Sequence, residues 1–133
     1  MPTRLSWKLS LEVTSGPSSE VVNAVDVDAY DHIEVKVPDT SSAPAATTID
    51  LQPGTAGKVK LLYIHSTKYG DNLKFHVHDN TTTERVLNDT LFLTGAGALA
   101  LVESSAAPLD KLLVTNTTGQ EVAVEIIIGR KAT

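Results

Sequence analysis

Cysteine is absent from the 133-residue sequence. This absence excludes disulfide bonds, thiolate metal sites and cysteine nucleophiles, and it is consistent with folding in a reducing cytosol. Aromatic residues are also scarce, at 5% of the chain. Sugar-binding β-sandwiches usually offer exposed aromatic side chains to their ligands, and Tyr30 and Tyr69 are the main candidates for that role here. The composition therefore disfavours a carbohydrate-binding domain without eliminating it.

Clusters of positive charge and long apolar runs are missing too. The formal net charge is −5, and lysine and arginine are scattered singly except at Lys58-Val59-Lys60. A nucleic-acid-binding surface would need a basic stripe, so we expect no nucleic-acid partner. No apolar run is long enough to span a bilayer, and the N-terminus shows neither the apolar segment nor the cleavage site of a secretory signal. We therefore expect no membrane partner and no signal peptide.

The short motifs of common catalytic sites are also lacking. There is no Gly-x-Ser-x-Gly elbow, no His-Glu-x-x-His and no isolated carboxylate pair in an apolar setting. Gly95-Ala96-Gly97-Ala98 shares glycines with a phosphate-binding loop but lacks its third glycine and its Lys-Ser/Thr pair. These small residues instead favour close backbone approach, at a bulge or at a contact between subunits. We expect no enzymatic activity and no cofactor, although a catalytic triad built from distant residues would leave no local motif.

The clearest pattern in the sequence is an alternation of apolar residues near its end. Every second residue over 122–128 is valine or isoleucine, which places these side chains on one face of a strand. The turn residues 116–120 precede this strand, and Leu112 and Val114 continue the alternation before the turn. The pattern predicts a closing β-hairpin.

Similar alternation, broken by turn signals at spacings of about 8–12 residues, predicts strands along the whole chain. Further strands are expected at 5–13, 21–27, 33–37, 48–51, 58–67, 73–78, 91–93 and 98–103. No segment has a helical period of useful length. The sequence thus predicts one all-β domain over residues 1–133, an antiparallel, jelly-roll-like β-sandwich of about ten short strands. Immunoglobulin-like sandwiches and small barrels are the alternatives. Residues 1–6 are expected to form an N-terminal arm and residues 130–133 a frayed tail.

Two histidines are the best candidates for metal ligands. His76 and His78 are separated by one residue on a predicted strand, so alternation places both imidazoles on the same face. Neutral imidazoles in this arrangement could share a metal ion. Two ligands do not complete a site, so a third would come from Asp79, His65 or a symmetry-related copy. The alternative is a pair of solvent-facing histidines on a half-exposed strand.

The C-terminal part of the chain carries a resemblance to a known class of proteins. The residues concerned are Leu91-Phe92-Leu93, then GAGALALVE, then LDKLLVTNTTGQEVAVEIIIGRKAT. This stretch resembles the C-terminal part of small virion proteins of tailed bacteriophages, in which a Gly/Ala-rich strand precedes a further strand and a final β-hairpin. The short chain, the lack of cysteine and the richness in threonine, alanine and valine fit the same class.

The resemblance implies a capsid decoration (cement) protein that binds the outer capsid lattice and stabilises it. It implies a homotrimer with two kinds of partner, other copies of the chain and the major capsid protein lattice. The expected location is the capsid surface of the virion, after synthesis in the host cytoplasm. The alternative is a carbohydrate- or ligand-binding β-sandwich module, including a receptor-binding component of a tail or baseplate. The expected oligomer or capsid contacts are Pro2, Thr3, Arg4, Gly95, Ala96, Gly97 and Ala98, together with the loop 39–46.

Overall fold

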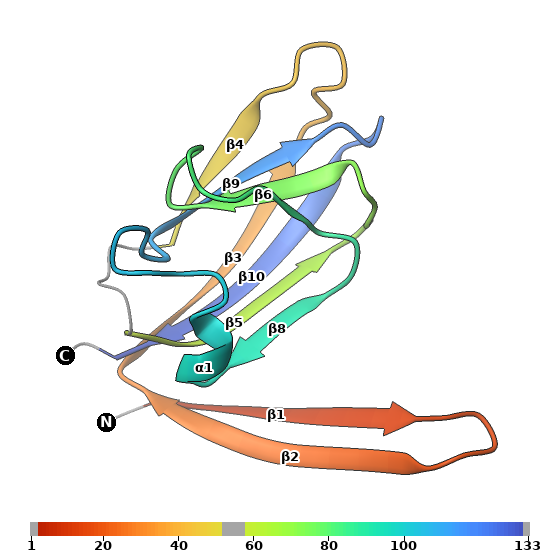
Figure 1. The fold of residues 1–133 in the computed structure, drawn as a ribbon, viewed down its shortest axis with the longest axis vertical. Coiled ribbons are helices and arrows are strands. Elements are labelled where there is room, and N and C mark those ends of the chain that lie inside the picture. Colours follow the sequence, from red (N-terminus) through yellow and green to blue (C-terminus); the bar gives the residue numbers. More distant parts are fainter. Residues whose placement is uncertain (1–2, 52–57, 132–133) are drawn as a thin grey trace.

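The structure, a computed structural model, describes residues 3–51 and 58–131. Over these residues it is nearly all-β, with ten strands, one short helix and only antiparallel strand pairs (Figure 1). The all-β, antiparallel architecture that the sequence predicts is therefore confirmed. The elements are β1 Thr3–Glu12, β2 Ser18–Val27, β3 Ala29–Val37, β4 Ala46–Asp50, β5 Val59–Ser66, β6 Leu73–Val77, β7 Arg85–Val86, β8 Leu91–Thr94, α1 Ala96–Leu99, β9 Lys111–Asn116 and β10 Val122–Arg130.

Two four-stranded sheets enclose one hydrophobic core in a sandwich-like arrangement. The first sheet has the strand order β3-β10-β5-β8 and the second has the order β4-β9-β6-β7. Alternate residues of each strand point inward, as in β10, where Val122, Val124, Ile126 and Ile128 are buried. Burial of these side chains is the main force that holds the sheets together. The jelly-roll topology stays a prediction.

The last two strands do not form the closing hairpin that the sequence predicts. β9 pairs with β4 and β6 in the second sheet, whereas β10 pairs with β3 and β5 in the first. The turn between them therefore crosses from one sheet to the other. Asn116 fixes this crossing, because its buried amide donates hydrogen bonds to the carbonyls of Val37 and Gln120. Alternation predicts both strands correctly. It does not distinguish two strands that pair within one sheet from two strands that belong to opposite sheets of a sandwich.

The segment after β8 also differs from the prediction. The sequence predicts an extended run over 98–103, but Ala96–Leu99 forms the single-turn helix α1 and Leu101 and Val102 lie in a turn. Gly95 precedes the helix with a φ of 90°, a left-handed value that favours glycine. Leu99 is buried in the core. Alanine has the highest helix propensity, and one turn is enough to bring this leucine inward.

The two ends of the described chain are held by hydrogen bonds. Residues 3–6, predicted as part of an arm, belong to β1 and pair with residues 24–27 of β2. β10 extends through Arg130, whose guanidinium donates to the Asp31 carboxylate at 2.6 Å, and the next amide donates to the Lys58 carbonyl. Pro2 of the predicted arm and residues 132–133 of the predicted tail lie outside the described residues.

β1 and β2 form a separate two-stranded hairpin that projects from the sandwich (Figure 1). The two strands pair along their full length, from Thr3 opposite Val27 to Glu12 opposite Ser18. In Figure 1 the outer half of this hairpin extends beyond the edge of the first sheet. We call β1, β2 and the turn between them the β1–β2 arm.

Candidate functional site

The β1–β2 arm has one apolar and one polar face. Side chains alternate along β1, and the register places Val25 opposite Leu5 and Val21 opposite Leu9. The side chains between them, on the other face, are mostly charged or carry hydroxyl groups. We call the first surface the apolar face of the arm. It consists of Leu5, Trp7, Leu9, Leu11, Val21 and Val25.

The base of this apolar face packs against the outer face of the first sheet. The Trp7 ring meets Phe92 of β8 edge to face, with centroids 5.2 Å apart. Gly129 of β10 permits the close approach of β1 and β2, because a Cβ there would lie 2.6 Å from Leu5 Cδ1 and 3.0 Å from Val27 Cγ1. A hollow of about 400 Å³ beside these contacts is lined by residues that include Leu5, Trp7, Leu61, Tyr63, Phe92 and Ile127. The base of the arm is thus anchored to the sandwich.

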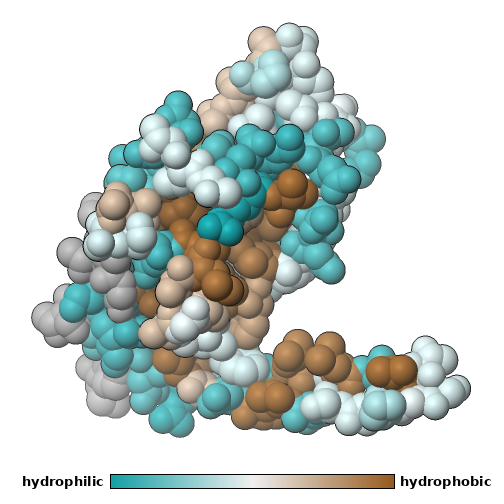
Figure 2. All heavy atoms as spheres, viewed as in Figure 1, coloured by the Kyte–Doolittle hydropathy of each residue, from teal (hydrophilic) through white to brown (hydrophobic). Residues whose placement is uncertain are grey.

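The outer part of the apolar face is open to solvent. Leu9 and Val21 expose 44% of their surface and Leu11 exposes 61%, while Val13 at the turn exposes 58%. Figure 2 shows the hydrophobic side chains that gather along the arm. Among the described residues, five of the eight exposed large hydrophobic side chains belong to the arm, and all but Val22 lie along its apolar face or at its turn. Exposed apolar groups are normal when scattered, but a contiguous group of this kind marks an interaction surface.

Two ion pairs join charged side chains across the polar face of the arm. Arg4 Nε lies 3.0 Å from Asp26 Oδ1, and Lys8 Nζ lies 3.4 Å from Glu20 Oε2, in both cases across the two strands. The hydrogen bond from Arg4 and its charge hold the pKa of Asp26 below its usual value. These cross-strand pairs favour the observed register. They also leave the apolar face free of charged side chains, so that a partner can cover it without desolvating an ion.

The two histidines predicted as metal ligands have separate hydrogen-bond partners. β6 ends one residue before His78, which has a φ of 75°, so the strand predicted to carry both imidazoles stops short of the second. His76 Nδ1 lies 2.9 Å from the Thr82 carbonyl oxygen, and His78 Nδ1 lies 2.8 Å from Asp110 Oδ1. Asp79, one of the expected third ligands, has its Oδ2 3.9 Å from His78 Nε2. A metal site at His76 and His78 stays a prediction.

The small residues predicted as subunit contacts lie on the surface around the start of α1. Gly95, Ala96 and Gly97 are exposed and Ala98 is half-buried. A Cβ at Gly95 or Gly97 would meet no atom within 4 Å, so neither glycine serves a close backbone approach within this chain. Their role as a contact between subunits stays a prediction, as does the role of Thr3 and Arg4 at the base of the arm.

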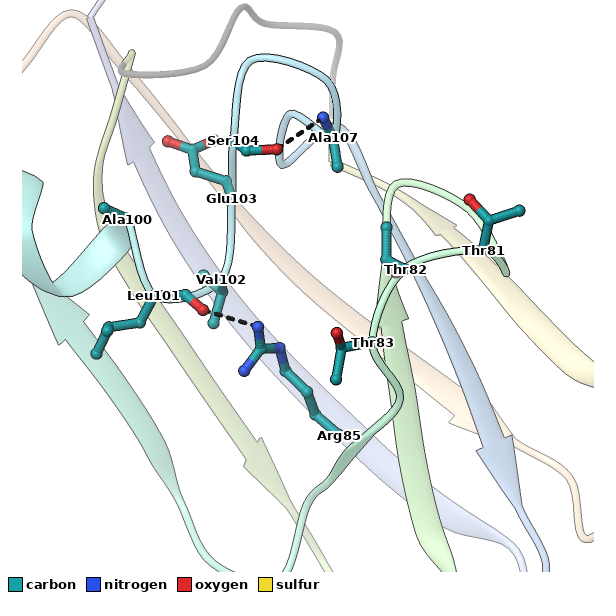
Figure 3. Close-up of a pocket in the computed structure, with 10 residues that line it drawn as sticks. All are labelled: Thr81, Thr82, Thr83, Arg85, Ala100, Leu101, Val102, Glu103, Ser104 and Ala107. Atoms are coloured by element: carbon teal, nitrogen blue, oxygen red, sulfur yellow. Dashed lines mark hydrogen bonds between the residues drawn. The ribbon is translucent and has the colours of Figure 1, made fainter.

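A second hollow, of about 350 Å³, lies between the loop after β6 and the segment after α1 (Figure 3). Threonines 81–83 line one side of it. Arg85 Nη2 donates to the Leu101 carbonyl at 2.7 Å, and the Glu103 carboxylate accepts a hydrogen bond from the Leu109 amide. These charged groups thus tie neighbouring loops together. The described residues of this hollow include no histidine or cysteine that could act beside a hydroxyl as a catalytic base or nucleophile.

A third group of polar side chains lies on the outer face of the first sheet. His32 and Glu34 of β3 and Glu125 of β10 each offer a ligand atom, and these atoms lie within 4.8 Å of one another. Sequence reasoning missed this group because His32 and Glu125 are 93 residues apart. Only the register of β3 with β10, which places Glu34 opposite Glu125, brings the three residues together.

Sequence reasoning also missed the exposed part of the arm. The alternation over 5–13 predicts a half-buried strand, and that strand is present as β1. The alternation does not indicate whether another element covers Leu9 and Leu11, and in the described residues none does. The one signal that we find in the sequence is the pair of adjacent valines Val21 and Val22, which places an apolar side chain on each face of β2, and the structure leaves both exposed.

Comparisons with known proteins found no matching family, no matching curated protein and no matching solved structure. Among the described residues, no helix has the length and apolar character needed to cross a membrane.

Proposed function

We propose that the chain is a non-enzymatic virion structural protein of the capsid decoration type, which docks on the outer lattice of a shell through the apolar face of the β1–β2 arm. The observation that carries the proposal is the solvent-exposed row formed by Leu9, Leu11 and Val21, on the part of the hairpin that extends beyond the sandwich. A contiguous apolar surface lowers the solubility of an isolated domain, so its presence favours a binding role. The resemblance of the C-terminal part to small phage virion proteins supports a capsid lattice as the binding partner.

The composition of the arm favours a protein surface as its partner. Its exposed residues are aliphatic, whereas sugar binding relies on aromatic rings, and the one tryptophan of the arm is engaged with Phe92. Its arginine and lysine are already paired with Asp26 and Glu20, so they do not form a basic surface for nucleic acid or anionic lipid. An apolar groove between capsid subunits would bury the exposed side chains of this face.

The size of the exposed face favours binding through several arms at once. Covering a leucine or valine that is about half exposed contributes about 1 kcal/mol. Leu9, Leu11 and Val21 together contribute about 3 kcal/mol, which is less than the roughly 4–15 kcal/mol that association costs. A single arm therefore binds weakly, whereas an oligomer that presents several arms to a repeating lattice binds through their combined effect. The proposed oligomer is a homotrimer.

The proposal is tested by co-sedimentation with heads assembled from the major capsid protein of the same virus. The wild-type chain is expected to pellet with the heads at a saturating, fixed ratio to the capsid subunits. The double variant Leu9→Ser/Leu11→Ser should bind at least ~10-fold more weakly, because it removes two of the three side chains of the exposed row. Val22→Ser, on the opposite face of the same hairpin, is the matched control and should bind like the wild type. Equal binding by the double variant, or no binding by the wild type, would contradict the proposal.

A ligand-binding β-sandwich module is the second candidate, favoured by the hollow beside Arg85. Its lining of threonine hydroxyls, a guanidinium and the Glu103 carboxylate has the composition of a polar ligand site. A glycan array distinguishes the two functions. Binding of a defined glycan that is lost in Arg85→Ala and kept in the arm variant would replace the decoration proposal with this one.

A further inference from the structure

We propose that His32, Glu34 and Glu125 form a binding site for a divalent first-row transition metal, with Zn²⁺ as the first ion to test. The site lies on the outer face of the first sheet, and it is independent of the docking proposed for the arm. One imidazole nitrogen and two carboxylate oxygens are a ligand set that zinc accepts, with open positions for water.

The ligand atoms already lie close to the spacing that a bound ion requires. His32 Nε2 lies 2.7 Å from Glu125 Oε2 and 3.7 Å from Glu34 Oε1, and all three ligand atoms lie within 4.8 Å of one another. Ligand bonds of about 2.0–2.2 Å around a zinc ion separate neighbouring ligand atoms by about 3–3.5 Å. Small side-chain rotations therefore bring all three atoms to coordination distance.

The backbone that carries these ligands is part of the paired sheet. Glu34 and Glu125 occupy directly opposite positions of β3 and β10, and His32 lies two residues from Glu34 on the same face. Both strands have buried inner faces in the core, so their register is fixed. Sites on such elements are more accurately placed than sites on loops.

The two facing carboxylates favour a bound cation, and this argument does not depend on the ligand spacing. Like charges directly opposite each other on a sheet face are destabilising, and Glu34 faces Glu125 in this way. Among the ion pairs of the described residues, His32 is the one basic side chain that contacts either carboxylate. A neutral imidazole would leave two facing carboxylates without a counter-charge, whereas a divalent ion would neutralise both.

The surroundings leave one side of the group accessible. The side chains of His32 and Glu34 are 46% and 72% exposed, so water molecules can complete the coordination. Glu125 is the most covered of the three. His65 of β5 lies opposite Glu125 on its other side, and its Nδ1 is engaged with the Tyr69 hydroxyl at 2.7 Å. His65 therefore lies beside the site but is not one of the three proposed ligands.

Titration calorimetry of the chelator-treated, full-length chain with zinc chloride tests the proposal. One ion should bind per chain, and Co²⁺ should give the visible absorption of a bound ion at the same stoichiometry. His32→Ala and Glu125→Gln should each weaken Zn²⁺ binding at least ~10-fold, since each removes a direct ligand. Absence of stoichiometric binding, or wild-type affinity in both variants, would overturn the site.

Two further variants separate this site from a merely structural ion pair and from the other histidines. Glu34→Gln should weaken metal binding, while its unfolding temperature without metal should equal or exceed that of the wild type because a like charge is removed. Loss of stability without metal and unchanged metal affinity would instead assign Glu34 to an ion pair alone. The matched control His76→Ala/Glu84→Gln alters a His–Glu contact between β6 of the second sheet and the residue before β7, and it should keep full affinity. Loss of binding in that control alone would move the metal to His76.

Discussion

The sandwich and the β1–β2 arm are built from the same sequence pattern but differ in what covers it. In both regions apolar residues alternate with polar ones, yet Leu62 of β5 is 0% exposed while Leu11 of β1 is 61% exposed. The inner faces of the two sheets cover each other, whereas no other described element covers the outer part of the arm. A period of two thus specifies a strand and an apolar face, and it leaves open whether the chain itself or a partner buries that face.

The same substitution made in both regions gives the sharpest form of this comparison. Leu62→Ala removes a fully buried side chain and should lower the free energy of unfolding by about 2–5 kcal/mol. Leu11→Ala should change it by no more than about 0.5 kcal/mol, because the side chain is already largely in water. Urea denaturation of both variants measures the difference. A loss above about 1.5 kcal/mol in Leu11→Ala would mean that the arm packs against the chain in solution.

The junction between arm and sandwich should be sensitive to a single added methyl group. Gly129→Ala places a Cβ within 2.6 Å of Leu5 and 3.0 Å of the buried Val27, so we expect a loss of about 1–3 kcal/mol from overpacking. Gly97→Ala is the matched control, since nothing lies within 4 Å of its new Cβ and the residue is in α1. That control should be neutral or slightly stabilising. Thermal unfolding of the two variants measures both effects, and equal melting temperatures would argue against the close approach.

Loosening the anchor should change the mobility of the arm more than the stability of the sandwich. Phe92→Leu removes the edge-to-face contact with Trp7, which is worth about 0.5–1.5 kcal/mol. Hydrogen exchange should then speed up in the amides of β1 and β2, while those of β5 and β10 keep their protection. Faster exchange throughout the chain would show that arm and sandwich unfold as one unit.

The smallest expected effect concerns pH and the ion pair on the polar face of the arm. Because the pKa of Asp26 is lowered in the folded protein, the pair with Arg4 stabilises the arm above the unfolded pKa of the carboxyl group. That contribution is lost as the pH falls through the folded pKa. Arg4→Gln should move the pKa of Asp26 back up toward its ordinary value, as NMR titration can measure. An unchanged pKa would show that the pair does not persist in solution.

Local pattern predicted most strands, and long-range pairing explains where it failed. Alternation placed strands correctly around β5, β6, β9 and β10. It assigned β9 and β10 to one hairpin because nothing in residues 116–120 shows that the Asn116 amide binds Val37 across the fold. It missed α1 because the single helical turn is shorter than any detectable period.

The candidate sites were less predictable than the fold because they depend on what lies opposite each strand. The spacing of His76 and His78 suggested a shared face, but the backbone of His78 leaves the strand. Glu34 and Glu125 lie opposite each other because of the register between β3 and β10, which cannot be predicted from the local sequence. The exposure of Leu11 likewise depends on the absence of a covering element among the described residues.

Side-chain footprinting of the chain, free and bound to assembled heads, tests the central claim most directly. The reactivity of Leu9, Leu11 and Val13 toward hydroxyl radicals should be high in the free protein, because these side chains are exposed. On the heads, their reactivity should fall strongly, while that of Leu101 on the sandwich stays unchanged. Protection of the sandwich surface with a fully reactive arm, or no protection at all, would contradict the proposed role of the β1–β2 arm.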